Sequence, residues 1–363
     1  MKVEEILLQM AGRAASDVHL VVGHPPAFRV HGQIQIADDL APVENWDLAE
    51  ALDRLLDGSQ RQAFDRDREM DFAVSLGDHN IRFRGNAAFE RGNISLVFRR
   101  ITDLELNIES LGLPAVIKQL ALKPSGLIIV TGTVGSGKST TLASMVDYVN
   151  SNTKRRIVTL EDPIEYVFTS KRSVITQREI GHDTKSFMGA LGRVLRQNPD
   201  VIMVGEARDA ATVEAVLTAS ETGHLVMTTA FAPSAPQTLD GIIGIFPPHH
   251  QPQVRTQIAS ILEAVIYQKL LPRADGKGRV AVCEVLLGTY AVRNLIRDGK
   301  THQLYSAMQL GSGQGMQTLD QSLLHLCMKG KITHESALAV ARDPEQLAQE
   351  LKSKHGPTRV PLG

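Results

Sequence analysis

The stretch TGTVGSGKSTT, at residues 131–141, decides the fold of this 363-residue chain. It directly follows the apolar run LIIV at 127–130. Four of its residues fit the pattern G-x-x-x-x-G-K-[ST]: Gly132, Gly137, Lys138 and Ser139. Glycines let backbone N–H groups converge on phosphate oxygens, and a helix N-terminus carries partial positive charge. The sequence therefore predicts a P-loop between a strand and a helix, built to hold a nucleoside triphosphate.

The residues of this loop have separate expected roles. Lys138 should reach the β- and γ-phosphates, and Ser139 should ligate Mg²⁺. The loop and the first helical turn should wrap the phosphates through Thr133, Val134, Gly135, Ser136, Gly137, Lys138, Ser139 and Thr140. Helical spacing after the loop predicts a buried face made of Leu142, Met145, Val146 and Val149.

A P-loop also needs an acidic partner for Mg²⁺ and a carboxylate that orients the attacking water. The apolar stretch VIMVGE ends at Glu206, and IVTLEDPIEY supplies Glu161, Asp162 and Glu165 after another apolar run. A single acid at a strand end is often a cap or a surface group. Parallel strands end at one edge of a sheet, however, so these acids and the loop are expected to converge there.

The predicted secondary structure changes along the chain. Residues 1–100 predict a small sheet with a helical interlude, and 101–113 read as a linker. From 114 to 363, short apolar runs alternate with helical patterns, which is typical of a parallel sheet covered by helices, and beyond about 284 the chain reads as mainly helical. One helix is predicted at 184–197, with Asp183 or Thr184 as its N-cap and Pro199 beyond its end.

Three arginines lie on strand candidates of the first region. In the stretch 81–89, the apolar side chains share one strand face, which leaves Arg82 and Arg84 on the other. Arg99 lies opposite the apolar face of the next strand by the same alternation. The pattern alone fits a solvated face as well as a site.

Composition excludes several classes of protein. With 43% hydrophobic residues and a formal net charge of −1, the chain is neither disordered nor a strongly basic nucleic-acid binder. Two cysteines, Cys283 and Cys327, cannot form a disulfide framework, which fits a reducing cytoplasm. No apolar run approaches the roughly 20 residues of a membrane span. At a membrane, a partner would therefore have to hold the protein.

Four motifs, in order and spacing, resemble those of the secretion ATPase superfamily of type II secretion and type IV pili. GTVGSGKSTTLASMVDYVN resembles its Walker A motif, RRIVTLEDPIEY its Asp box, RQNPDVIMVGEARD its Walker B motif, and TGHLV, with His224, its His box. AVRNLIRDGK, at 291–300, is similar to the AIRNLIRE motif of the PilT-type branch, the pilus retraction ATPases. The segments ASDVHLVVGHPPAFRVHGQI and RFRGNAAFERGNISLVFRRI match that family's N-terminal domain, so the resemblance covers nearly the whole chain.

The resemblance implies an α/β protein in which a PAS-like α+β domain at 1–100 precedes a RecA-like P-loop ATPase domain with a helical C-terminal region. It implies a ring-shaped homohexamer that uses ATP and Mg²⁺ to drive pilus retraction from the cytoplasmic side of the inner membrane. Its partners would be the pilus platform protein in that membrane and other pilus ATPases. Neither nucleic acid nor direct membrane insertion is implied.

The resemblance also implies roles for individual residues. Glu165 would be the catalytic carboxylate, and Glu206 would support Mg²⁺ or the attacking water. Glu161, Asp162 and His224 would lie at the nucleotide. Arginines of the family's N-terminal domain reach the nucleotide of a neighbouring subunit, and the matching positions are Arg82, Arg84 and Arg99. In 291–300, periodicity alone predicts a packed helix with a solvated basic side, formed by Arg293 and Arg297.

Two departures from the family pattern keep alternatives open. The His box usually continues as T-L-H-T, whereas residues 229–232 read TAFA, with Phe231 in place of histidine, and a D-R pair appears as Asp240-Gly241. A phenyl ring cannot hydrogen-bond a phosphate. A nucleotide-binding accessory paralogue with little or no hydrolysis is therefore one alternative.

A pilus assembly ATPase is a second alternative, although the short N-terminal region, the missing four-cysteine cluster and AVRNLIRD oppose it. A DNA translocase or a nucleotide kinase is a third, but no basic channel or lid pattern is visible in the sequence.

Overall fold

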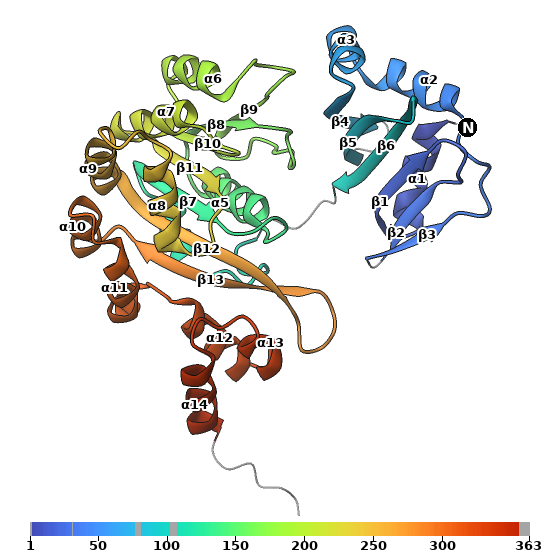
Figure 1. Ribbon diagram of the computed structural model, residues 1–363. Coiled ribbons are helices and arrows are strands. Elements are labelled where there is room, and N and C mark those ends of the chain that lie inside the picture. The colour runs from blue at the N-terminus through green and yellow to red at the C-terminus, as the bar shows by residue number, and fades with distance from the viewer. Residues whose placement is uncertain (1, 31, 77–80, 102–106, 356–363) are drawn as a thin grey trace, which may run out of the picture. The chain divides into compact units, whose positions relative to one another are not determined.

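The computed structural model describes residues 2–30, 32–76, 81–101 and 107–355, and the chain forms two compact units. The first unit comprises Met1–Leu104 with Pro163–Tyr166, and the second comprises Glu105–Asp162 with Val167–Gly363. The linker expected at 101–113 lies partly outside the described residues, at 102–106. Each unit is described by itself below (Figure 1).

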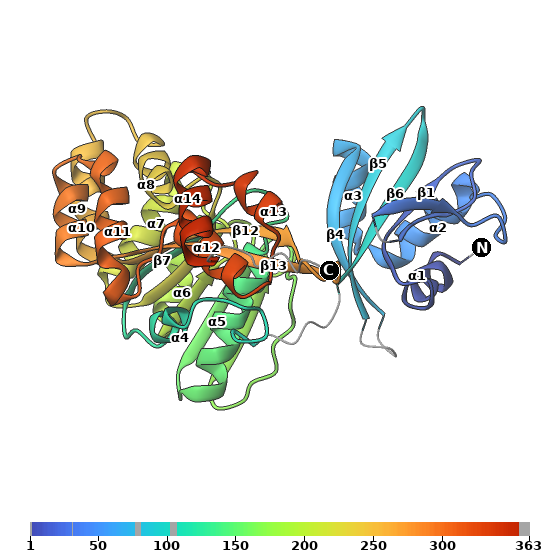
Figure 2. The same ribbon diagram turned by 90° about the horizontal axis from the view of Figure 1, so that it is seen from below.

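A six-stranded antiparallel sheet, in the order β3-β2-β1-β6-β5-β4, forms the centre of the first unit. Its strands are β1 (Ala15–Val21), β2 (Ala27–Val30), β3 (Gln33–Ile36), β4 (Glu69–Leu76), β5 (Ile81–Glu90) and β6 (Asn93–Ile101). Three helices share one core with this sheet: α1 (Val3–Gly12), α2 (Asn45–Leu55) and α3 (Gly58–Asp67) (Figure 2). Because side chains alternate along a strand, the buried Phe83 and Phe98 leave polar neighbours on the opposite face. The predicted alternation is confirmed.

The second unit is built on a seven-stranded sheet in the order β13-β12-β7-β11-β10-β8-β9, parallel except for β13. Its strands are β7 (Gly126–Thr131), β8 (Arg156–Glu161), β9 (Val174–Glu179), β10 (Val201–Val204), β11 (Leu225–Ala230), β12 (Leu262–Pro272) and β13 (Arg279–Leu287). Every residue of β7, β10 and β11 is buried, as expected for strands covered on both faces. The predicted helix-covered parallel sheet is confirmed.

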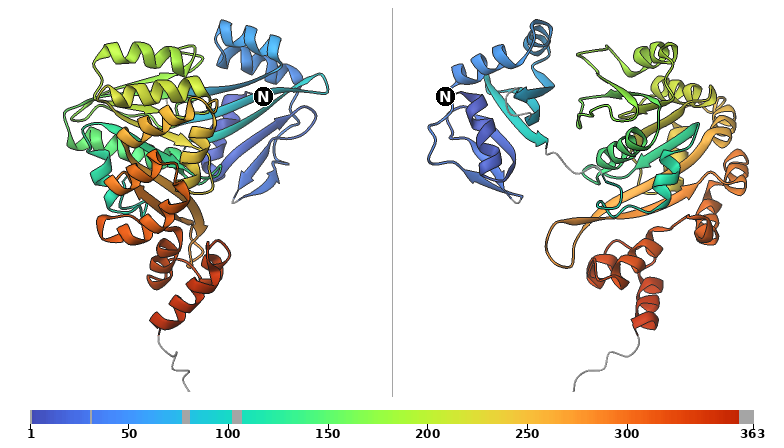
Figure 3. Two further views of the ribbon diagram at one scale, coloured as in Figure 1. Left: turned by 60° about the vertical axis from the view of Figure 1, so that its left-hand side comes forward. Right: turned by 180° about the vertical axis from the view of Figure 1, so that it is seen from behind.

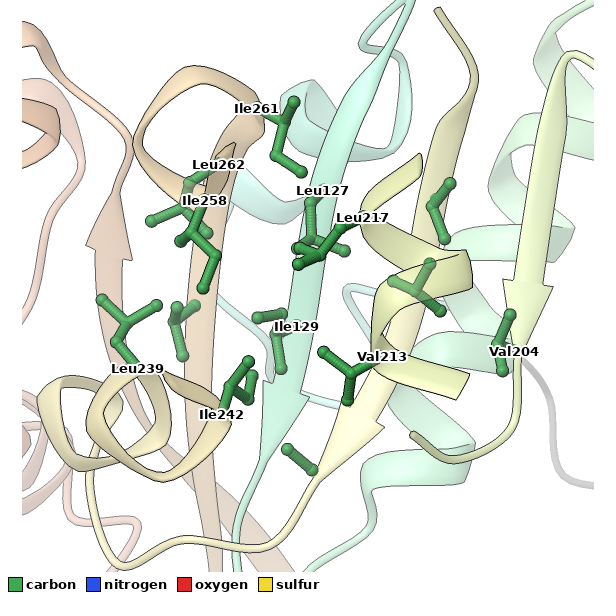
Figure 4. Packing of buried hydrophobic residues seen from close by; sticks show 14 of the residues in the cluster. Leu127, Ile129, Val204, Val213, Leu217, Leu239, Ile242, Ile258, Ile261 and Leu262 are labelled. Atoms are coloured by element: carbon green, nitrogen blue, oxygen red, sulfur yellow. The ribbon is translucent and has the colours of Figure 1, made fainter. Parts of the chain in front are cut away.

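Helices cover both faces of this sheet. On one face, α4 (Val116–Ala121) and α5 (Lys138–Asn152) pack on Ile128 and Val130. The predicted face of α5 is buried as expected. The other face is covered by α6 (Phe187–Val194), α7 (Ala210–Glu221), α8 (Ala235–Gly244) and α9 (Gln251–Ile261). Figure 4 shows Leu127 and Ile129 of β7 packed against side chains of these helices, including Val213 and Ile258.

Helices follow the β12–β13 hairpin, but they begin later than expected. The segment after residue 284 is still strand, because the buried Val285 and Leu286 continue the pairing of β13 with β12. The helices are α10 (Tyr290–Arg297), α11 (Leu304–Leu310), α12 (Leu319–Met328), α13 (His334–Leu338) and α14 (Pro344–His355). The last three pack with β12 and β13 in a small separate core (Figure 3). In the described ranges, no helix has both the length and the apolar character needed to cross a membrane.

The helix predicted at 184–197 is shorter than expected and has a different N-cap. Ser186 caps α6 by accepting a hydrogen bond from the Gly189 amide, at 3.2 Å. The two expected caps are wrong because Asp183 accepts from the Glu179 amide instead, at 2.8 Å, and Thr184 pairs with the end of β9. The final turn, Leu195–Gln197, is a 3₁₀-helix.

Candidate functional site

The predicted P-loop connects β7 to α5 with the expected strand–loop–helix geometry. Gly132, Gly135 and Gly137 have φ values of 147°, 75° and 86°, which side chains rarely allow. These conformations turn the chain tightly enough for α5 to begin at Lys138. The first amides of α5 lack intrahelical partners, and they lie at the carboxyl end of a parallel strand. This is the position where α/β sheets bind ligands.

Lys138 is folded back over its own loop. Its ammonium group donates hydrogen bonds to the carbonyl oxygens of Gly132 and Thr133, each at 3.0 Å. The side chain is buried, although residues 133–135 beside it are exposed. The cation is thus held inside a loop that is open to solvent.

The P-loop is braced from β12 by Gln268, a residue that sequence reasoning missed. Its side-chain amide donates to the Ser136 carbonyl oxygen at 2.7 Å, and its Oε1 accepts from the Thr141 hydroxyl at 2.6 Å. Gln268 is almost fully buried, so these bonds are shielded from water. A signal that could have found it is the position of this glutamine at the end of the apolar run AVIY, in a strand that is otherwise mostly apolar.

Two of the predicted acids, Glu161 and Glu206, lie at the carboxyl ends of β8 and β10, at the same edge of the sheet as the P-loop. β8 and β10 run parallel to each other and, through β11, parallel to β7. Glu161 is the last residue of β8, where it accepts from Thr159 Oγ1 at 2.6 Å and from Gln177 Nε2 at 3.1 Å. Glu206 follows β10 and forms an ion pair with Arg208. This hydrogen bond and ion pair raise the pKa of Arg208 further above its usual value.

The Phe231 ring contacts both the P-loop and Arg208, in the segment that follows β10. The Lys138 ammonium nitrogen lies 3.9 Å from the centre of its ring, and the Arg208 guanidinium carbon lies 5.5 Å from the same point. Both distances are within the range of cation–π attraction. Through this ring and the ion pair of Arg208 with Glu206, the structure brings Lys138 and Glu206 into one cluster. From the sequence alone, Phe231 is recognisable only as the loss of a hydrogen-bonding group, and Arg208 has no predicted role.

The structure does not bring His224 together with the P-loop of the same chain, and its predicted place at a nucleotide stays a prediction. His224 precedes β11, whereas the P-loop follows the parallel strand β7. A six-residue strand spans roughly 17–20 Å, which separates the two edges. His224 Nδ1 lies 3.0 Å from the Ala219 carbonyl oxygen, so its ring caps the end of α7 instead.

The three arginines of the first unit share the polar face of its sheet. Arg84 and Arg99 are direct cross-strand partners. Such like charges repel each other, and each has an acidic neighbour: Arg99 donates to Asp17 at 2.7 Å, and Arg84 donates to Asp71 at 3.3 Å. Burial opposes ionisation of Asp17, but hydrogen bonds from Ser16 and Arg99 keep its pKa below the usual value.

The remaining predicted site residues of the first unit are Arg82 and Glu165. Arg82 lies across from Ile101 in the same sheet. Glu165 belongs to the short segment Pro163–Tyr166, which groups with the first unit, and its catalytic role stays a prediction.

The helix of the AVRNLIRD motif is packed as expected on its apolar side, with Val292 and Ile296 fully buried. Its basic side is not uniformly solvated. Arg293 donates to the Gly288 carbonyl oxygen at 2.7 Å, to Glu263 at 2.9 Å and to the Ser260 carbonyl oxygen at the end of α9. Arg297 remains exposed. Arg293 therefore fastens α10 to α9 and β12, and the expectation of solvation is wrong for this residue.

A glycine-turned loop between a buried parallel strand and a helix N-terminus, on a sheet covered by helices, is the arrangement by which α/β proteins bind nucleotides and other phosphates. Residues 2–339 match the family model described as type II/IV secretion system protein, and the chain belongs to this family.

Individual relatives are similar over nearly the full length. The chain is 43% identical to the type IV pilus retraction ATPase PilT of Pseudomonas aeruginosa, covering 95% of this chain and 99% of that protein. It is 40% identical to the type IV pilus ATPase PilU of the same organism, covering 97% and 92%. A crystal structure of the pilus retraction motor PilT with bound ADP superposes with a TM-score of 0.88, at 42% identity, covering 96% of this chain and 99% of that one.

Proposed function

We propose that this protein is a motor ATPase that drives retraction of type IV pili. The observation that carries the proposal is the P-loop itself, whose glycine turns place Lys138 at the start of α5, beside the helix N-terminus. The similarity to a retraction ATPase over nearly the full length of both chains supports the mechanical output. It also favours retraction over the pilus assembly alternative.

The proposed architecture has three parts. Residues 1–100 form a PAS-like domain, 101–113 a linker, and 114–363 a RecA-like ATPase domain with a helical C-terminal region. The working assembly is a homohexameric ring. Its partner is the pilus platform protein, which holds the ring at the cytoplasmic face of the inner membrane, and other pilus ATPases join it there.

The loop fits the triphosphate of ATP on two counts. It combines the amides of a helix start with a lysine, and the buried Ser136 hydroxyl oxygen has no hydrogen-bond partner among the described residues. Lys138 would move from its two carbonyl partners to the β- and γ-phosphates.

The same edge of the sheet fits Mg²⁺. Ser139 and Glu206 would hold the ion, which neutralises charge on the phosphates when it is bound. One hydroxyl and one carboxylate suffice because Mg²⁺ in such sites takes most of its other ligands from phosphate and water. Asp162 and Glu161, at the end of β8, would orient water and Glu165 near the phosphates.

Glu165 and Glu206 are the proposed chemical groups. Replacing either with glutamine should lower the hydrolysis rate at least about 100-fold, because a carboxylate that polarises water or supports Mg²⁺ is lost. Nucleotide affinity should change only a few-fold. Single-turnover hydrolysis and equilibrium binding measured on each variant check this. Turnover like that of the wild type in one variant would remove that residue from the proposal.

Arg82, Arg84 and Arg99 are proposed to reach the nucleotide of a neighbouring subunit. Asp17 and Asp71 would have to release Arg99 and Arg84, because a guanidinium that stabilises phosphate charge cannot keep the same carboxylate contact. Exchange of a carboxylate partner for a phosphate would couple the nucleotide state to the orientation of the first unit.

A second candidate function is that of a nucleotide-binding ring subunit with weak hydrolysis. The contact of Phe231 with Lys138 favours it, because a ring over the lysine opposes phosphate binding.

Pilus retraction in a strain lacking this gene tests the motor function. Complementation with the wild-type gene should restore retraction, and complementation with Lys138→Ala should not. Binding of nucleotide without restored retraction would instead support the accessory subunit. Equal retraction with both genes would reject a motor driven by this P-loop.

A further inference from the structure

Phe231 covers one side of the Lys138 ammonium group. The ring centre lies 3.9 Å from the ammonium nitrogen. A phosphate oxygen hydrogen-bonded to an ammonium lies about 2.8 Å from the nitrogen. On the line toward the ring, such an oxygen would overlap the ring itself. The ring and a phosphate therefore cannot hold this side of Lys138 at the same time.

The surroundings of Lys138 make the contact with the ring matter energetically. Lys138 is only 8% exposed, so the cation is largely removed from water. Cation–π attraction strengthens as the cation loses water, and for a desolvated lysine it corresponds to roughly 5- to 30-fold in an equilibrium constant. The Gly132 and Thr133 carbonyl oxygens hold the ammonium from its loop side. Loop and ring together hold the Lys138 ammonium group between the two carbonyl oxygens and the ring.

Phe231 itself lies at the surface and outside the core clusters. It is 48% exposed and lies in the turn between β11 and α8, one residue after the end of the strand. Its other ring partner, Arg208, is 73% exposed and is also held by Glu206. Moving the ring away from Lys138 therefore disturbs little of the core, and it uncovers the lysine and loosens Arg208 together.

We propose that Phe231 is an affinity-setting residue that occludes Lys138 in the nucleotide-free chain and must be displaced when a nucleoside di- or triphosphate binds. The proposal rests on the proposed function, since the ligand is the nucleotide of the P-loop. It adds that this chain binds nucleotide more weakly than the same loop would without the ring. Nucleotide concentration would then set the fraction of subunits in which Lys138 is uncovered.

The test measures the Kd of the full-length chain for Mg–ADP by calorimetry. Phe231→Leu removes the ring face and keeps an apolar side chain, so it should tighten binding about 5- to 30-fold. Leu310→Ala, at an 88% exposed position on α11, is the control and should leave the Kd unchanged. Thermal unfolding of each variant verifies that the fold is intact.

A double-mutant cycle assigns the effect to Lys138. In a Lys138→Ala background, Phe231→Leu should change the Kd less than about two-fold, because the contact that it removes is already absent. Unchanged or weaker binding by Phe231→Leu overturns the inference, as does tightening that persists without Lys138. Nucleotide binding by the wild type separates failure of the inference about Phe231 from failure of the proposed function. If neither the wild type nor Phe231→Leu binds nucleotide, the proposed function fails as well.

Discussion

Replacing Gly132 with alanine should weaken nucleotide binding roughly 100-fold or more, equivalent to about 3 kcal/mol. Gly132 has a φ of 147°, and an added Cβ would lie 2.3 Å from the Gln268 carbonyl oxygen and 2.7 Å from Ser136 Oγ. The Gln268 carbonyl is held in place because Gln268 pairs with Cys283 of β13 and the preceding Tyr267 pairs with both β7 and β13. The loop must therefore shift away from the geometry that holds phosphates.

Gly135→Ala is the matched control for this change. Gly135 lies in the same loop and also has a positive φ, 75°, but nothing lies within 4 Å of its added Cβ. The Gly135→Ala substitution should therefore cost only the free energy of backbone strain, about 1–2 kcal/mol. Calorimetric titration with ADP compares the two variants. Near-normal binding by Gly132→Ala, together with loss of binding in Gly135→Ala, would show that the brace from β12 does not shape the loop.

Replacing Glu284 with glutamine should stabilise the second unit at pH 8 by up to about 3 kcal/mol, because the wild-type carboxylate is ionised there without adequate compensation. Glu284 lies in the centre of β13, is 2% exposed, and its Oε1 has no hydrogen-bond partner among the described residues. Burial raises its pKa from 4.5 to about 7, while the Ala235 amide and Arg342 oppose the shift and Asp320 adds to it.

The direction with pH follows from proton binding. Between about pH 4.5 and pH 7, the folded chain keeps the proton of Glu284 after the unfolded chain has released it. The contribution of Glu284 to the free energy of unfolding is therefore largest below pH 4.5, and it is lost as the pH rises through 7. The glutamine variant is neutral throughout, so its advantage should grow between pH 5 and pH 8.

Thermal unfolding of the wild type and the variant at both pH values measures this advantage. The expected rise in melting temperature at pH 8 is about 5–10 °C. Glu214→Gln, at an exposed position in the middle of α7, is the control and should show no such growth. A constant difference between the wild type and Glu284→Gln at both pH values would mean that Glu284 does not titrate in this range.

The parts of the fold that were predictable share a local cause. Strands β7, β10 and β11 and residues 157–160 of β8 contain only apolar residues and threonine, because burial on both faces disfavours charged side chains. The P-loop glycines were predictable because its backbone conformation excludes side chains. The arginine face was predictable because alternation along a strand is strict.

Other features depended on contacts that no local pattern encodes. Strand β12 begins at Leu262, immediately after α9 ends at Ile261, and no glycine or proline marks the change. Gln268 reaches a loop more than 100 residues earlier in the chain. The contact of Phe231 with Lys138 likewise exists only because β7 and β11 are neighbours. His224 is a different case: its position before β11, rather than after it, already implied the opposite edge of the sheet.

ATP hydrolysis by the purified full-length protein, with and without Lys138, tests the central claim most directly. The claim is that the loop after β7 and the acids after its parallel neighbours form one triphosphate site. Phosphate release in the presence of Mg²⁺ should be measurable for the wild type and at least about 100-fold slower for Lys138→Ala, with the melting temperature of the free protein preserved. Equal rates for the two proteins would contradict the account.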